Sequence, residues 1–105
     1  MDHTIFNPDE TVRLLNGVRD PIRMDIILLL AQNKSMNVGD ITTRFKISRP
    51  AISHHLKVLK DAGILQCEKI GQEVFYCLDR AHVVAGLRRI ADEIENCCSY
   101  NKALE

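Results

Sequence analysis

The most informative segment of this 105-residue chain is residues 48–65, which read SRPAISHHLKVLKDAGIL. Ser48 can cap a helix and Pro50 is tolerated in a first helical turn, so a helix is predicted over residues 49–61. Gly63 is typical of the position just beyond a helix C-terminus. The apolar residues of this helix form one stripe that is expected to face the core, namely Ala51, Ile52, Leu56 and Leu59.

The opposite face of the same helix is polar and positively charged. Between residues 41 and 60 the chain has five cations and no carboxylate, although its formal net charge is zero. Hydrogen-bond donors and cations of these kinds contact bases and phosphates in the major groove of DNA. Arg49 lies in the first turn and is expected to meet bases, and a solvated helix face is the alternative explanation. The candidate DNA contacts are Ser48, Arg49, Pro50, Ser53, His54, Lys57 and Lys60, the two lysines toward phosphates.

The segments before this helix predict a helix-turn-helix. Asn37 can cap a short helix, and Lys46-Ile47 forms the turn that follows it. Further upstream, Asn7-Pro8 and Asp20-Pro21 each mark the start of a helix. The helix from Asp20-Pro21 to about Gln32 is too apolar to lie on the surface, so we expect it at the centre of the core.

The segments after Gly63 predict a β-hairpin and a last helix. Two β-type runs, residues 64–69 and 73–78, flank Gly71-Gln72, and Cys67 and Cys77 are expected near opposition across them. A helix over residues 81–98 carries apolar side chains at heptad spacing. A chain of this size has few other apolar side chains that could bury this stripe, so we expect a homodimer interface rather than core packing alone. The interface residues would be Val12, Leu15, Val83, Leu87, Ile90 and Ile94.

Composition excludes several classes of protein. Hydrophobic residues make up 46% of the chain and charged residues 27%, which is typical of a folded protein. The fold class predicted is mainly α with a hairpin, about five helices and two strands, in a single domain over residues 1–105. The longest apolar run is too short to cross a membrane, and the start lacks the pattern of a secretory signal, so a cytoplasmic location without a membrane partner is expected. No Cys-x-x-Cys occurs, so a thiol redox enzyme, or any other enzyme, is not expected.

Three motifs resemble the ArsR/SmtB family of bacterial repressors. Residues 20–26 (DPIRMDI) resemble the family's DPxRxxIL helix opening, and residues 48–65 are similar to its SQxxVSxHLxxLxxAGLV signature. Residues 69–78 (KIGQEVFYCL) resemble its wing, xxGRxxxYxL. The resemblance implies a dimeric winged helix-turn-helix repressor that binds inverted-repeat operator DNA and is released by a metal ion or other inducer. A winged-helix module that binds protein rather than DNA is the alternative function.

The resemblance also assigns roles to single residues. His55 is expected to pack and hydrogen-bond within the domain, whereas His54 faces DNA. In the wing, Gln72 stands where the family often has arginine, and Glu73 adds a negative charge. Lys69 and Gln72 remain candidate DNA contacts, but a carboxylate beside the backbone repels phosphate, so we expect a weak contribution from the wing.

The inducer is predicted by elimination among the family's sites. Asn37 and Gly39 stand where the arsenic-type site has a Cys-x-Cys pair. The zinc-type site matches four residues of which only two are ligands, so zinc is not expected to act through them: Arg80, His82, Glu93 and Asn96. Soft thiolates suit As(III) and other thiophilic metal ions, so Cys97 and Cys98 are the predicted sensing thiols for such an ion or an oxidant. Packing in the dimer interface is the alternative role for Cys97.

Overall fold

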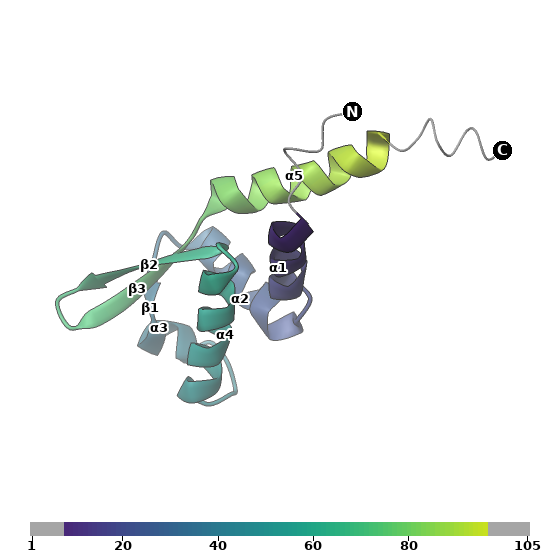
Figure 1. Cartoon of the computed structure of the whole chain (residues 1–105). Helices are drawn as coiled ribbons and strands as arrows, with labels where there is room; N and C mark the ends of the chain where they lie inside the picture. The colour runs from purple at the N-terminus through teal and green to yellow at the C-terminus, as the bar shows by residue number, and fades with distance from the viewer. Residues whose placement is uncertain (1–7, 97–105) are drawn as a thin grey trace.

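The computed structural model of the chain describes residues 8–96. Within this range the chain forms five helices and a small antiparallel sheet, whose β2–β3 hairpin extends beyond the helices (Figure 1). The helices are α1 (Pro8–Val18), α2 (Pro21–Gln32), α3 (Val38–Thr42), α4 (Arg49–Asp61) and α5 (Arg80–Asn96). The strands are β1 (Met36–Asn37), β2 (Leu65–Ile70) and β3 (Glu73–Leu78), in the order β1-β3-β2.

The predicted starts of α2, α3 and α4 are confirmed by side-chain caps. Asp20 Oδ1 accepts hydrogen bonds from the backbone of the first turn of α2, at 2.8 and 3.2 Å. Asn37 Oδ1 accepts from the N–H of Asp40 at 2.8 Å, and Ser48 Oγ accepts from the N–H of Ala51 at 3.3 Å. These bonds satisfy backbone donors that a helix leaves unpaired at its N-terminus. The cap predicted at Asn7 lies outside the described residues.

The predicted glycine at the end of α4 is also confirmed. Gly63 has φ +78°, a left-handed conformation that other residues avoid. Its N–H donates to the carbonyl of Lys60 at 2.9 Å, and the N–H of Ile64 donates to that of Leu59 at 3.0 Å. This pair of bonds is the Schellman motif, which ends the helix and turns the chain so that Ile64 enters the core.

The core forms around α2, as its apolar sequence predicted. Ile26 and Leu30 of α2 are fully buried, and α1 contributes Leu14. In α4 the predicted inward stripe is buried, except that Ala51 is only half-buried. The other fully buried side chains come from α3, from α4 and from the residue just before β2, namely Ile41, Ile52, Leu56, Leu59 and Ile64. Among the described residues no helix is long and apolar enough to cross a membrane.

The sheet has one strand more than predicted, and its register places the two hairpin cysteines. The two-residue strand β1, too short to show an alternating pattern, pairs with β3 and adds a third strand. In the hairpin, Cys67 pairs with Tyr76 and Cys77 pairs with Gln66. Directly paired residues share a face and successive residues alternate, so the two cysteines lie on opposite faces of the sheet. Cys67 and Cys77 therefore lie near opposition, as expected, but the offset of one residue places them on opposite faces and prevents a bond between them within the hairpin.

The helix α5 begins two residues after the end of β3 and runs past α1 (Figure 1). Asp79 caps it, with Oδ1 accepting from the N–H of His82 at 3.1 Å. Gly86 is buried where α5 meets α1. A larger residue would not fit there, because a Cβ at this position would lie 2.6 Å from Leu14 Cδ2. The apolar residues at heptad spacing on α5 fall into two groups, one that packs on the core and one that is exposed. Val83 is buried in the core of its own chain and Ile90 is half-buried against it, whereas Leu87 is 44% exposed and Ile94 66% exposed.

Candidate nucleic-acid interface

The helices α3 and α4 and the turn between them form the predicted helix-turn-helix. Every residue proposed from the sequence to contact DNA is exposed on α4, on its cap or on the hairpin: Ser48, Arg49, Pro50, Ser53, His54, Lys57, Lys60, Lys69 and Gln72. On the opposite side of α4, Ile52, Leu56 and Leu59 have no exposed surface. The helix is thereby held with one fixed face outward, and that face carries donors and cations.

The wing and the start of α4 lie on either side of one shallow groove. Arg49 from α4 and Gln72 and Glu73 from the hairpin all line this groove, together with the first residues of α3. The structure therefore brings together two predicted DNA contacts, Arg49 and Gln72, that lie far apart in the sequence. Between the hairpin strands, Gly71 has φ +64°, which is typical of the first residue of a two-residue type II′ turn.

Lys57, one of the predicted phosphate contacts, has a carboxylate neighbour that its sequence pattern alone did not indicate. Lys57 Nζ lies 3.3 Å from Asp61 Oδ2, one turn further along α4. Both side chains are more than 60% exposed, at 76% and 64%. An exposed pair of this kind contributes little to stability, so the lysine remains available to exchange the carboxylate for a phosphate.

The most extensively bonded polar side chain in the core is Arg23, the arginine of the DPxRxxIL motif, to which no role was assigned from the sequence. It is 8% exposed. Its Nε donates to the carbonyl of Gly17 at 3.1 Å and its Nη2 to that of Asn16 at 3.0 Å, which satisfies carbonyls at the C-terminus of α1. Its Nη1 lies 3.2 Å from His55 Nδ1 on α4. The signal that could have identified it is a cation between Ile22 and Ile26, on the buried side of α2.

The contact with Arg23 ties His55 to α2. A guanidinium has only donors, so Nδ1 of His55 is the acceptor that faces it, at 3.2 Å. The expectation that His55 bonds within the domain is thus confirmed, and His54 is exposed. At the same junction the pKa of Asp20 is lowered, chiefly by the hydrogen bond from the backbone N–H of Arg23.

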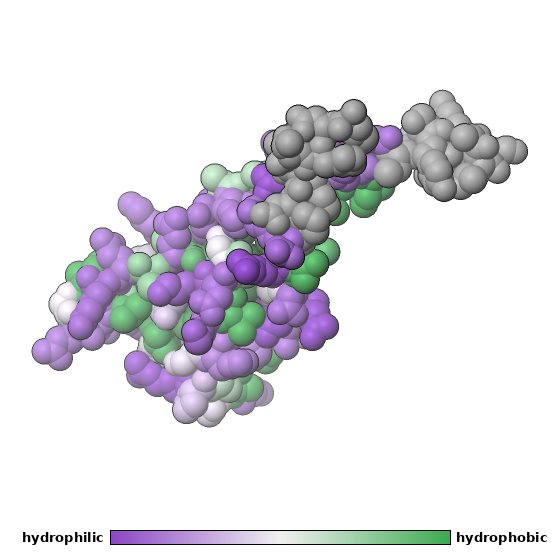
Figure 2. Space-filling view, in the orientation of Figure 1, coloured by the Kyte–Doolittle hydropathy of each residue, from purple (hydrophilic) through white to green (hydrophobic). Residues whose placement is uncertain are grey.

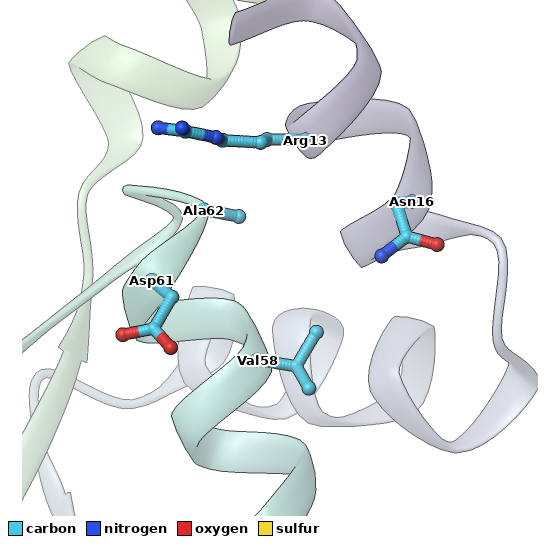
Figure 3. Close-up of a pocket in the computed structure, with 5 residues that line it drawn as sticks. All are labelled: Arg13, Asn16, Val58, Asp61 and Ala62. Carbon is cyan, nitrogen blue, oxygen red and sulfur yellow. The ribbon is translucent and has the colours of Figure 1, made fainter. Parts of the chain in front are cut away.

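A wider groove separates α1 from the C-terminal half of α4. It has a volume of about 530 Å³ and is lined by Arg13, Asn16, Val58, Asp61 and Ala62. Figure 3 shows that these side chains do not converge on one point, since Arg13 extends across the groove whereas Asp61 points away from it. This arrangement does not form a set of donors around a common ligand.

Two of the four residues that match the family's zinc-type site, Arg80 and His82, make other contacts. Arg80 Nη2 donates to the carbonyl of Ala31 at the end of α2. The ring of His82 packs against Gly63, where a Cβ would lie 2.7 Å from Nε2. Within residues 8–96 no group of three or more His, Cys, Asp or Glu side chains is placed to hold a metal ion. Cys67 and Cys77 are half-buried free thiols, and Cys97 and Cys98 lie outside the described residues.

Hydrophobic side chains are exposed away from the helix-turn-helix. Figure 2 shows them along α5 and on the hairpin, while hydrophilic residues cover most of the visible face. On α1 and α5 the exposed apolar residues include four of the six predicted for the dimer interface, which are Val12, Leu15, Leu87 and Ile94.

The fold and this surface define a winged helix-turn-helix protein, the class that the sequence predicted. The family model of the bacterial regulatory proteins of the arsR family matches residues 20–66. The chain is 38% identical to an uncharacterized HTH-type transcriptional regulator of Methanocaldococcus jannaschii, over 82% of this chain and 96% of that protein. It is 35% identical to the arsenical resistance operon repressor of Escherichia coli, over 82% of this chain and 73% of the repressor.

A solved structure agrees with these relatives. The homodimeric winged helix-turn-helix DNA-binding domain of a possible ArsR-family regulator from Mycobacterium bovis superposes with a TM-score of 0.69 and 26% identity, over 89% of this chain and 88% of that one. The chain belongs to the arsR family of transcriptional regulators, which confirms the resemblance inferred from its motifs.

Proposed function

We propose that this regulator is a cytoplasmic repressor that binds an inverted-repeat operator as a homodimer, with α4 in the major groove. The observation that carries the proposal is the division of α4 into a fully buried apolar stripe and an exposed face of donors and cations. A two-fold dimer presents two such helices, so the half-sites should lie about 10 bp apart or a multiple of that spacing.

Arg49 and Lys57 have different roles in this proposal, and substitution separates them. Arg49 at the start of α4 pairs with a base, so Arg49→Ala should cost about 1–3 kcal/mol on the operator and relax the preference at one base pair. Lys57 contacts a phosphate, so Lys57→Ala should weaken operator and random DNA alike and lower the salt slope by about one. Electrophoretic mobility shifts over a salt series measure both effects. Equal losses on operator and random DNA for both variants would contradict the assignment.

The homodimer in this proposal forms through α1 and α5. Its support is the exposed apolar surface on these two helices and the homodimeric state of the Mycobacterium bovis domain. Light scattering should give about twice 11.9 kDa. Leu87→Asp, on α5, should lower this mass toward that of one chain. Leu28→Asp is the matched control, because Leu28 is similarly exposed but lies on α2.

The inducer in this proposal binds thiols. The arsenical resistance operon repressor of Escherichia coli is a relative over most of this chain, and Cys97 and Cys98 are adjacent. As(III), another thiophilic metal ion or an oxidant would react with them and lower operator affinity by about 5- to 150-fold. The test compares operator affinity with arsenite, Cd(II) and peroxide in the parent and in Cys97→Ser/Cys98→Ser. An unchanged response in the double variant would transfer the role to Cys67 and Cys77.

The zinc-type residues have no part in this release. Arg80 carries a positive charge and its guanidinium is engaged with the end of α2, so it cannot serve as a ligand. Zinc should therefore not release the operator through His82 and Glu93. Zinc-dependent release that His82→Ala abolishes, with Cys97 and Cys98 intact, would contradict this part of the proposal.

A further inference from the structure

The wing is attached to the rest of the domain through β1 and through helices α2, α3 and α4. The hairpin of β2 and β3 projects away from the helices (Figure 1). Beyond their own pairing, β3 pairs with β1 through Phe75 and Tyr76, β2 packs against α4, and β3 packs against α2 and α3. On β2, Leu65 at the base of the hairpin is buried, whereas Lys69 and Ile70 beside the turn are exposed. A contact close to the turn can therefore influence the direction of the outer part of the hairpin.

Asn37 and Glu73 supply that contact. Asn37 pairs with Phe75, and Glu73 lies two residues nearer the turn on β3, so it is on the same face and is a diagonal neighbour of Asn37. Asn37 Nδ2 donates a hydrogen bond to Glu73 Oε1 at 2.7 Å. The other side of the same amide, Oδ1, caps α3 by accepting from the N–H of Asp40 at 2.8 Å. One side chain therefore joins the wing to the first turn of the helix-turn-helix.

The contact lies beside the proposed DNA surface. Asn37 and Glu73 line the same groove as Arg49 and Gln72. A change in the direction of the hairpin would therefore change the separation between the start of α4 and the end of the wing. That separation decides whether both can contact one DNA duplex at the same time.

We propose that the hydrogen bond between Asn37 and Glu73 orients the wing relative to α4, so that both are positioning residues for DNA binding. The inference rests on the proposed function, because it assumes that α4 and the wing bind the same duplex. In this proposal Glu73 is not only a negative charge that repels DNA phosphate. The carboxylate does carry that electrostatic cost, but its oxygen also holds the wing in place.

Two substitutions at Glu73 separate the bond from the charge. Glu73→Gln removes the charge and keeps an oxygen that accepts from Asn37, so operator affinity should equal or exceed that of the parent. Glu73→Ala removes the charge and the bond, and its affinity should be about five- to tenfold below that of Glu73→Gln, as expected for loss of one hydrogen bond between neutral groups. Equal affinities for the two variants would overturn the proposal, because charge alone would then explain both.

A substitution at Asn37 tests the same bond without a change of charge. Asn37→Ser keeps a residue that can cap α3 but removes the amide donor, so it should lower affinity by a similar factor. Combining it with Glu73→Ala should give little further loss, since both remove one bond. Fully additive losses would overturn the proposal. Glu68→Gln and Glu68→Ala are the matched controls on exposed β2, and these two should bind equally.

A measurement without DNA tests the orientation of the wing separately from the proposed function. Residual dipolar couplings of backbone amides report the direction of β2 and β3 relative to α4. They should be unchanged in Glu73→Gln and altered in Glu73→Ala and Asn37→Ser. Unchanged couplings in all three variants would refute the wing orientation, whether or not DNA is bound. Altered couplings with no binding to any operator by the parent would instead refute the proposed function.

Discussion

Replacement of Arg23 by lysine should destabilise the domain far more than its conservative character suggests. The guanidinium donates to two carbonyls of α1 and contacts His55 on α4, at 3.0–3.2 Å, while its side chain is only 10% exposed. The donors of lysine radiate from one atom and cannot reach all three acceptors. A hydrogen bond from a charged group contributes about 1.5–3 kcal/mol. Loss of two such bonds should therefore lower the free energy of unfolding by about 3–6 kcal/mol.

Urea unfolding followed by circular dichroism measures this difference. Total stabilities of domains are about 5–15 kcal/mol, so a large fraction would be lost. All variants must be compared at one protein concentration, because dimerisation contributes to apparent stability. The control is Arg88→Lys, at an exposed position on α5, which should change stability by less than about 0.5 kcal/mol. A similarly small effect for Arg23→Lys, with an unchanged dependence on urea, would refute the reasoning.

Three further predictions concern stability. Gly63→Ala should lower the free energy of unfolding by about 1–3 kcal/mol in urea unfolding, because φ is +78° and the new Cβ would meet the ring of His82. Gly86→Ala gains about 1 kcal/mol of helix propensity but forces a methyl group against Leu14, so a thermal melt should show a net loss. The pKa of Asp20 is lowered in the folded state, so its charged form stabilises the fold at pH values above the ordinary pKa of an aspartate. This contribution is lost as the pH falls through the lowered pKa of the folded state. Asp20→Asn should therefore reduce stability near neutral pH and approach the parent in acid, and a constant difference across the pH range would contradict this.

Local features of the domain were predictable from the sequence. The starts of α2, α3 and α4 depend on Asp20, Asn37 and Ser48, and each side chain bonds a backbone donor two or three residues away. The Schellman motif at Gly63 likewise spans only a few residues. The inward stripe of α4 follows from the helical period of its own residues. Such features depend on neighbours in the chain, so the local order of residue types is enough to reveal them.

The tertiary structure alone decided the contacts between distant segments. Arg23 meets His55 across 32 residues of sequence, and Asn37 meets Glu73 across 36 residues. The pairing of β1, and the burial of Val83 beside the exposure of Leu87, depend in the same way on how packed elements lie against one another. A side chain contributes the same donors wherever it lies, but its partner is selected by the packing of the whole core. The sequence therefore revealed which face of α4 points outward, whereas the packing determined what holds that face and the wing in position.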